Sequence, residues 1–327
     1  MDGMPGMPGM SGDLPPLDAG RLFALHPSAD WFFFAGTIVA LLAYLAGAVR
    51  LRRRGDAWPL VRTVSWTAGL VTVFLVTCTG ANVYGMQMFS VHMVQHMVLS
   101  MLSPILLLLG APITLALRAL RPASRGRRGP RELLVAVLHS RYVRVISFPA
   151  ITIPLFIASL YGLYFTPLFD ILMRHSWGHT LMMAHFVAVG LLFFWPIMGV
   201  DPGPHRSGHV MRMLELFAGM PFHAFFGVAL MMASGLEVTT FAHPAASLGV
   251  NPLSDQHAAG GLAWAFSEIP SVIVLIALTS QWAKSERRQA RRKDRAADRD
   301  GDAELAAYNA YLASLEARSA GGGSAAS

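Results

Sequence analysis

The chain has 327 residues, of which 54% are hydrophobic and only 14% charged, and its mean hydropathy is +0.47. Soluble globular domains carry about 25% charged residues, so this composition indicates an integral membrane protein. A single cysteine, Cys78, excludes an internal disulfide framework and a CxxC metal site. Without a zinc-finger or other nucleic-acid-binding motif, the net charge of +7 does not indicate a nucleic-acid-binding protein.

The predicted elements begin with a flexible tail over 1–30, in which glycine and proline separate evenly spaced methionines. A membrane helix needs about 20 mostly apolar residues, and 31–282 contains seven such stretches. They are 31–49, 62–82, 91–117, 145–165, 176–199, 212–235 and 258–282. The third contains Pro104 and Pro112, so we expect it to kink, or to end near Pro112 and continue along the interface. Residues 283–327 predict a basic tail, partly helical and then disordered.

Lysine and arginine predict the orientation of these spans. All but two of the 26 basic residues fall on one set of alternating loops and on the C-terminal tail; the exceptions are Arg21 and Arg174. Because basic loops stay in the cytoplasm, the N-terminus is expected outside and the C-terminus inside. The sequence thus predicts an all-α integral membrane protein of the cell membrane, a bundle of seven transmembrane helices in the lipid bilayer.

Histidines gather on the side opposite to the arginines. His92 and His96 are four residues apart, so both rings project from one helix face and could bind one metal ion. Three nearby methionines add thioethers, a soft ligand that selects Cu(I); they are Met86, Met88 and Met93. The pattern predicts a copper site at the outer membrane–water interface. The alternative is that these histidines bind only water or headgroups and the methionines fill the core.

Other histidines extend this set. His179 and His257 lie at the outer ends of their spans, and His185 lies deeper, rotated away from His179 on a straight helix. We include all three among the candidate ligands. His223 and Glu268 are predicted at similar depth, where a carboxylate needs a partner or a proton. They form a possible inner polar layer that passes a proton or a metal ion, unless both are purely structural.

Three stretches resemble the CtaG family of membrane-embedded assembly factors for caa-type cytochrome c oxidases. They are FSVHMVQHMVLSMLSPILLLLGAP (89–112), HTLMMAHFVAVGLLFFWPIMGVDPGP (179–204) and DQHAAGGLAWAFSE (255–268). The resemblance covers roughly 30–282 and implies a seven-span fold and a role in making an active oxidase, with help in bringing copper to its copper centre. It carries over His92, Gln95 and His96 with their motif, and His179 and His185 as the pair of the fifth span.

The leading hypothesis is a copper-handling assembly factor that hands Cu(I) to an oxidase subunit or to another copper chaperone. A copper transporter and a haem-binding membrane redox protein, with His96 and His179 as haem ligands, are the alternatives. Enzyme signatures such as GxSxG, HExxH or a P-loop are absent from the sequence. The N-terminal methionines are interpreted as a low-affinity capture arm for copper, or else as incidental; they are Met1, Met4, Met7 and Met10.

Overall fold

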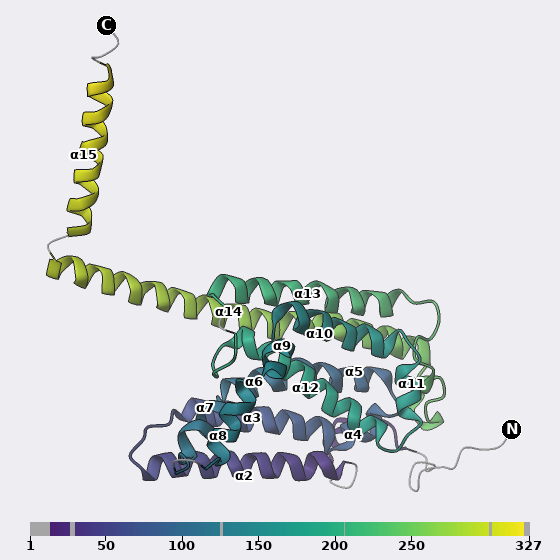
Figure 1. Cartoon of the computed structure of the whole chain (residues 1–327). Helices are drawn as coiled ribbons and strands as arrows, with labels where there is room; N and C mark the ends of the chain where they lie inside the picture. Colours follow the sequence, from purple (N-terminus) through teal and green to yellow (C-terminus); the bar gives the residue numbers. More distant parts are fainter. Residues whose placement is uncertain (1–13, 27–29, 125–126, 206, 301–302, 324–327) are drawn as a thin grey trace. The chain divides into compact units, whose positions relative to one another are not determined.

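The computed structural model of the chain describes residues 14–26, 30–124, 127–205, 207–300 and 303–323 (Figure 1). These residues are helical between their turns and loops, and they contain no strand beyond one isolated bridge between Leu25 and Thr79. The predicted all-α fold is therefore confirmed for this part of the chain. The chain divides into two compact units, Met1–Leu275 and Ile276–Ser327.

Most of the long helices follow the apolar stretches, whereas α14 continues well past residue 282. In chain order they are α1 (Ala19–Leu22), α2 (Trp31–Arg53), α3 (Leu60–Thr77), α4 (Gly80–Gly85), α5 (Phe89–Met97), the π-helix η1 (Val98–Leu102), α6 (Ser103–Leu109), α7 (Pro112–Ala119), α8 (Pro130–Leu138), α9 (Arg141–Ile146), α10 (Pro149–Tyr164), α11 (Leu168–Met173), α12 (Gly178–Met198), α13 (His209–Met232), the 3-10 helices η2 (Thr239–Phe241) and η3 (Ala246–Leu248), α14 (Pro252–Asp300) and α15 (Ala303–Gly323). α14 crosses the boundary between the two units, and α15 belongs to the second.

Among the described residues, six helices are long and apolar enough to cross a membrane: α2, α3, the run from α5 to α7, α12, α13 and α14. The predicted span over 145–165 corresponds to α10, which is apolar but has only 16 residues. At 1.5 Å per residue it is about 24 Å long, shorter than the ~30 Å hydrocarbon core of a bilayer. Six of the seven predicted spans thus meet the length criterion.

The third predicted span is interrupted, as its prolines indicated. α5 passes into a π-helical turn at Val98–Leu102 before α6 begins with Pro104 in its first turn. The helix then ends at Gly110, and Ala111, with φ of 51°, turns the chain into α7. A left-handed backbone at a residue other than glycine is uncommon, and here it redirects the helix. π-helical turns often accompany functional sites.

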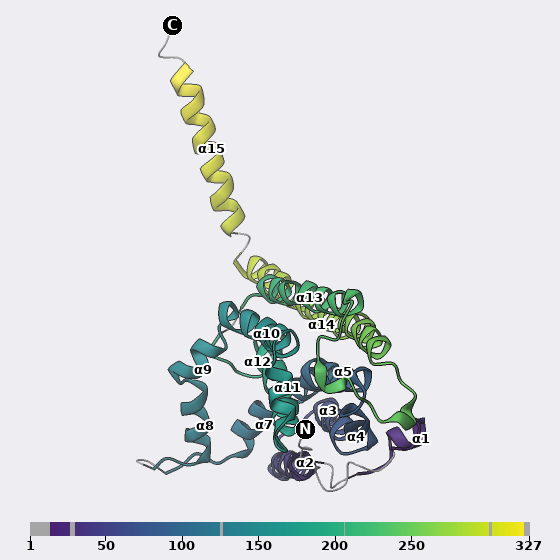
Figure 2. The same cartoon turned by 90° about the vertical axis from the view of Figure 1, so that its right-hand side faces the viewer.

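The run from α5 to α7 is the most buried of the six candidate spans. Figure 2 looks along the first unit and shows α5 between α3 on one side and α13 on the other. Contacts join α6 to α3 and α12, and α10 to α12 and α13. Small residues allow these close approaches: a Cβ added at Gly190 of α12 would lie 2.2 Å from the carbonyl oxygen of Ser100.

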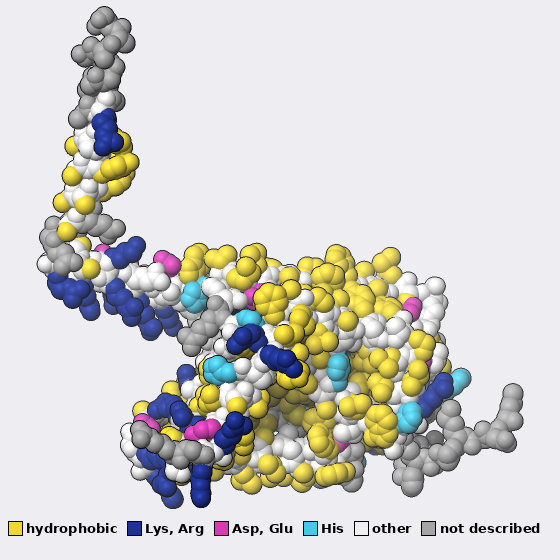
Figure 3. Space-filling view, in the orientation of Figure 1, with side chains coloured by type: hydrophobic (Ala, Val, Ile, Leu, Met, Phe, Trp, Pro, Cys, Tyr) yellow, Lys and Arg dark blue, Asp and Glu magenta, His cyan; other side chains and the backbone are white. Residues whose placement is uncertain are grey.

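Hydrophobic and basic side chains of the first unit occupy different parts of its surface. In Figure 3 hydrophobic side chains cover most of the visible face, and arginines gather at the end where α2 finishes and α7 and α8 lie. This charge asymmetry is what the predicted orientation rests on. The orientation itself remains a prediction.

Candidate metal centre

The buried histidines are organised by α5, whose first turn is tied to α14. Asp255 accepts hydrogen bonds from the backbone N–H groups of Phe89 (2.6 Å) and Ser90 (3.3 Å). A carboxylate at a helix N-terminus satisfies donors that have no partner within the helix and suits the helix dipole. Gln95 anchors the other side of α5 by donating to the carbonyl of Val76 on α3 at 2.7 Å. These contacts fix the rotation of α5 about its axis.

That rotation turns His92 and His96 inward. They are 0% and 2% exposed, so both rings are packed inside the bundle. The outer membrane–water interface as the position of the site stays a prediction. The prediction that both rings share one helix face is confirmed, because both contact Tyr164 and Phe186.

His92 faces α10 and α12. Its Nε2 lies 3.1 Å from the hydroxyl of Tyr164, and its ring centroid lies 5.8 Å from that of His179. Nδ1 of His92 and Nε2 of His179 are both buried and have no hydrogen-bond partner among the described residues. This first imidazole pair joins the third and fifth predicted spans.

One helical turn along α5, His96 faces His223 of α13, with ring centroids 6.2 Å apart. Both nitrogens of His96 and Nε2 of His223 are buried without a hydrogen-bond partner in the described part of the chain. A small cavity of about 10 Å³ lies between α5, α10, α12 and α13, lined by both histidines and by Ser100 and Ser159. That is room for about one water molecule or one ion.

Aromatic rings enclose the two pairs. Within 4–6.5 Å of a histidine ring, centroid to centroid, lie the rings of Phe156, Phe169, Phe186, Phe241 and Tyr164. Asp170 holds the loop that carries Phe241, because its carboxylate accepts hydrogen bonds from the N–H and hydroxyl groups of Thr239 and Thr240. Aromatic side chains therefore surround the imidazoles, apart from the small cavity beside His96 and His223.

Two other predicted ligands, His185 and His257, have hydrogen-bond partners of their own. His185 bonds instead to the hydroxyl of Ser159 at 2.6 Å, as its rotation from His179 indicated. His257 lies 2.9 Å from the carbonyl of Ala233. Met88 and Met93 are buried and Met86 is half-buried. Met1, Met4, Met7 and Met10 lie outside the described residues.

The predicted inner polar layer is wrong in one member. His223 is 2% exposed and belongs to the cluster, whereas the side chain of Glu268 is exposed on the outside of α14. Helical spacing places Glu268 and His257 on nearly the same side of α14. Spacing alone does not indicate which side of α14 packs against the bundle. Tyr164 and Asp255, which position His92, were missed; neither stands in a spacing that signals a ligand.

The centroid separations of the two pairs are compatible with two imidazoles on opposite sides of one ion. A ring nitrogen bound to a metal lies about 2 Å from it, and about 1 Å separates that nitrogen from its ring centroid, so two imidazoles sharing an ion have centroids about 6 Å apart. The two pairs, at 5.8 and 6.2 Å, match this separation. In the residues that the structure describes, no three His, Cys, Asp or Glu side chains are grouped to hold a metal.

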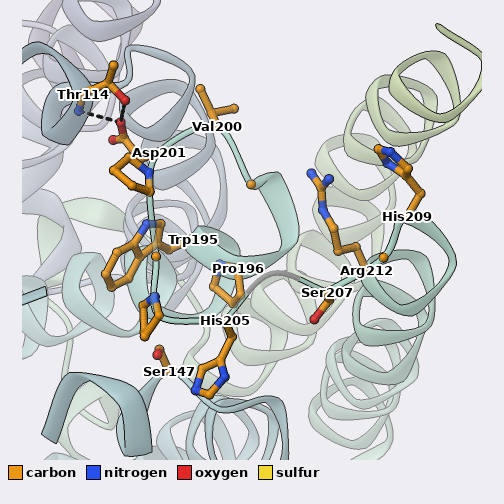
Figure 4. A pocket seen from close by; sticks show the side chains of 15 residues that line it. Thr114, Ser147, Trp195, Pro196, Val200, Asp201, His205, Ser207, His209 and Arg212 are labelled. Carbon is orange, nitrogen blue, oxygen red and sulfur yellow. Dashed lines mark hydrogen bonds between the residues drawn. The ribbon is translucent and has the colours of Figure 1, made fainter. Parts of the chain in front are cut away.

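A separate polar cavity of about 470 Å³ lies where α12 joins α13 (Figure 4). Asp201 accepts hydrogen bonds from Thr114 and so caps the start of α7. Arg212 donates to the last carbonyls of α12, and Ser207 donates to Glu215. The charged groups of this cavity thus tie helix ends together.

Comparison with known proteins gives a family. The profile of the cytochrome c oxidase caa3 assembly factors (Caa3_CtaG) matches residues 42–285. Uncharacterised proteins of Mycobacterium bovis and Mycobacterium tuberculosis are each 47% identical to the chain over 289 residues, and one of Mycobacterium leprae is 46% identical. These alignments cover 88% of this chain but 44% of each relative, so the chain spans less than half their length. No solved structure matches the chain.

Proposed function

Since the chain belongs to the family of cytochrome c oxidase caa3 assembly factors, we propose that it helps an oxidase acquire copper and binds Cu(I) inside its helical bundle. The role is non-catalytic: the protein holds and passes on an ion that the oxidase needs. The cell membrane is its proposed location, in keeping with the six helices among the described residues that are long and apolar enough to span a bilayer.

One observation carries the copper proposal. Both ring nitrogens of His96 are buried without a hydrogen-bond partner among the described residues, and the ring of His223 faces it with a further nitrogen in the same condition. A buried polar atom left unpaired costs about 1–3 kcal/mol, and ionisable side chains inside a membrane protein usually serve a function. A ligand in the adjoining cavity removes this cost.

The donor set favours Cu(I) over zinc. Structural zinc sites use four protein ligands and catalytic ones three, whereas Cu(I) is a soft ion that tolerates few ligands. Thioethers suit it as well, and Met93 of α5 and Met182 of α12 are buried in the helices that carry the histidines.

The proposed route of the ion passes through the two pairs. His92 with His179 forms the first station, where Tyr164 orients the His92 ring by its hydrogen bond. His96 with His223 forms the second station, one turn further along α5. Imidazole binds a metal ion through its neutral form, so binding brings no additional charged side chain into the bundle. An oxidase subunit or another copper chaperone is the proposed recipient.

Copper analysis of the purified chain under reducing conditions tests this proposal. The wild type should retain copper, while His96→Ala and His223→Ala should lose most of it. His175→Ala provides the control, because His175 is an exposed histidine outside the cluster. Equal copper content in all four proteins would overturn the site. Because an alanine can also disturb folding, each variant is first checked for an unchanged elution volume in detergent.

A copper transporter is the second candidate, and the succession of two pairs along α5 favours it over a haem protein. The cavity between His96 and His223 holds one small ligand, not a porphyrin. Uptake of copper into vesicles containing the purified chain would distinguish transport from delivery.

A further inference from the structure

An apolar groove runs along the outside of the bundle between α2 and α7. It has a volume of about 470 Å³, within the range of about 300–1,000 Å³ usual for ligand pockets. Small side chains hollow it out: α2 contributes three alanines and a glycine, and α7 two alanines. These are Ala40, Ala43, Ala46, Gly47, Ala116 and Ala119.

The floor of the groove is rigid. Tyr44 donates a hydrogen bond to the carbonyl of Gly110 at 2.7 Å, and its ring stacks on Trp66 with centroids 4.9 Å apart. Leu115 packs beneath Gly47, where a Cβ would lie 3.3 Å from it. The hollow therefore results from packed side chains that cannot easily collapse into it.

A second cavity of about 420 Å³ continues the groove at the end of α2. The two cavities share Ala46 and Arg50. The remaining lining of the second cavity is mostly arginine, contributed by Arg53, Arg54 and Arg121. The groove thus changes from apolar to strongly basic along its length.

The four arginines of the groove, Arg50, Arg53, Arg54 and Arg121, differ from neighbouring arginines in their charge partners. Arg118 forms an ion pair with Asp56 at 3.5 Å and lies over the ring of Trp58, and Arg62 lies over the same ring. No ion pair is recorded for the four arginines of the groove within the described residues. Their positive charge is concentrated at one end of the apolar groove, and a negatively charged ligand could balance it.

We propose that this groove binds one anionic membrane phospholipid, with its phosphate against the four arginines and an acyl chain along α2 and α7. Basic pockets beside transmembrane helices are suited to acidic headgroups. A free phosphate would leave the apolar part unfilled, and a zwitterionic lipid would leave the arginine charge uncompensated. Only an anionic lipid matches both halves.

Binding is tested with the full chain, delipidated in detergent, by native mass spectrometry and by the thermal midpoint of unfolding. Phosphatidylglycerol is compared with phosphatidylcholine of the same acyl chains, and glycerol phosphate serves as the headgroup alone. We expect phosphatidylglycerol to bind and raise the midpoint, and both other probes to have at most a small effect.

Matched variants locate the site. Arg50→Gln and Arg53→Gln should each weaken phosphatidylglycerol binding about fivefold, the equivalent of ~1 kcal/mol for an arginine near a lipid surface. Arg52→Gln changes the same charge on the same turn, outside both cavities, and should leave binding unchanged. Ala43→Phe should block the apolar part, whereas Val39→Phe, on the exposed face of α2, should not.

Three results would overturn the proposal. Equal binding of the two lipids would remove the anion site, and an equal loss in Arg52→Gln would reduce the effect to general surface charge. Stabilisation by glycerol phosphate as strong as by the lipid would remove the role of the groove. A variant that elutes as an aggregate is replaced by Arg54→Gln or Ala116→Phe, whose side chains line the same two cavities.

Discussion

His96 of α5 and His223 of α13 face each other in the centre of the bundle, with ring centroids 6.2 Å apart and no hydrogen-bond partner recorded for three of their four ring nitrogens among the described residues. A histidine kept only for packing would bond to a neighbouring carbonyl or hydroxyl, as His185 and His257 do. The contrast makes His96 and His223 the stronger ligand candidates, while His185 and His257 remain predicted ligands.

Replacing His96 by leucine should separate stability from function. The variant removes two unpaired buried nitrogens, so the free energy of unfolding of the copper-free protein should stay constant or rise by about 1 kcal/mol. Bound copper should be lost. Denaturant unfolding in detergent and elemental analysis measure the two effects. A loss of more than about 2 kcal/mol would show instead that the His96 nitrogens hold a structural hydrogen bond.

The carboxylate of Asp255 should affect copper through helix α5. Asp255→Ala removes the acceptor for the N–H groups of Phe89 and Ser90, at a cost of about 1–2 kcal/mol, and frees the turn next to His92. We expect both a lower unfolding midpoint and weaker copper binding. Asp201→Ala removes the corresponding cap of α7 and should lower the midpoint similarly without weakening copper binding. Equal copper affinity in the two variants would contradict the positioning role.

Gly190 and Gly162 provide a test of packing around the site. A Cβ at Gly190 would lie 2.2 Å from the Ser100 carbonyl, whereas at Gly162 of α10 it would meet nothing within 4 Å. Gly190→Ala must push α12 away from η1. It should lower the free energy of unfolding by about 1–3 kcal/mol, the usual cost of overpacking. Gly162→Ala should stabilise by up to about 1 kcal/mol through helix propensity. Thermal unfolding of both variants measures this difference, and similar midpoints would count against the tight contact.

Acid should weaken the loop that covers the His92 pair. Burial raises the pKa of the Asp170 carboxyl, but hydrogen bonds from Thr240 and Thr239 outweigh it and hold that pKa below its usual value. A depressed pKa stabilises the fold at pH above the unfolded value of about 3.9, and this contribution disappears as the pH falls through the lower, folded pKa. Asp170→Asn should therefore be less stable than wild type at pH 7, with the difference shrinking below about pH 4. A difference that is constant with pH would show that the carboxylate charge is not involved.

The direction of insertion is still a prediction from the arginines. A fusion of green fluorescent protein to the C-terminus should fluoresce, because the C-terminus is expected in the cytoplasm. Alkaline phosphatase, which is active only outside, should be inactive at the same position. The reverse result would place the end of the bundle rich in arginine outside.

Much of this protein follows from its sequence alone. Runs of about 20 apolar residues can satisfy their backbone hydrogen bonds in lipid only as helices, so six of the predicted spans correspond to candidate membrane helices among the described residues, although α14 continues well past residue 282. Pro104 and Pro112 marked the interrupted third span. The four-residue spacing of His92 and His96 fixed their common face, because it depends only on helix geometry.

Tertiary packing decided which histidines meet. His92 pairs with His179 and His96 with His223 because Asp255 and Gln95 set the rotation of α5, and because Gly190 lets α12 approach η1, which continues α5. Helical periodicity gives each residue an angle on its own helix but no information about the neighbouring helix that this angle faces. For that reason the sequence placed Glu268 with His223, whereas the packing of α14 turns its carboxylate outward and leaves the centre of the bundle to imidazoles and aromatic rings.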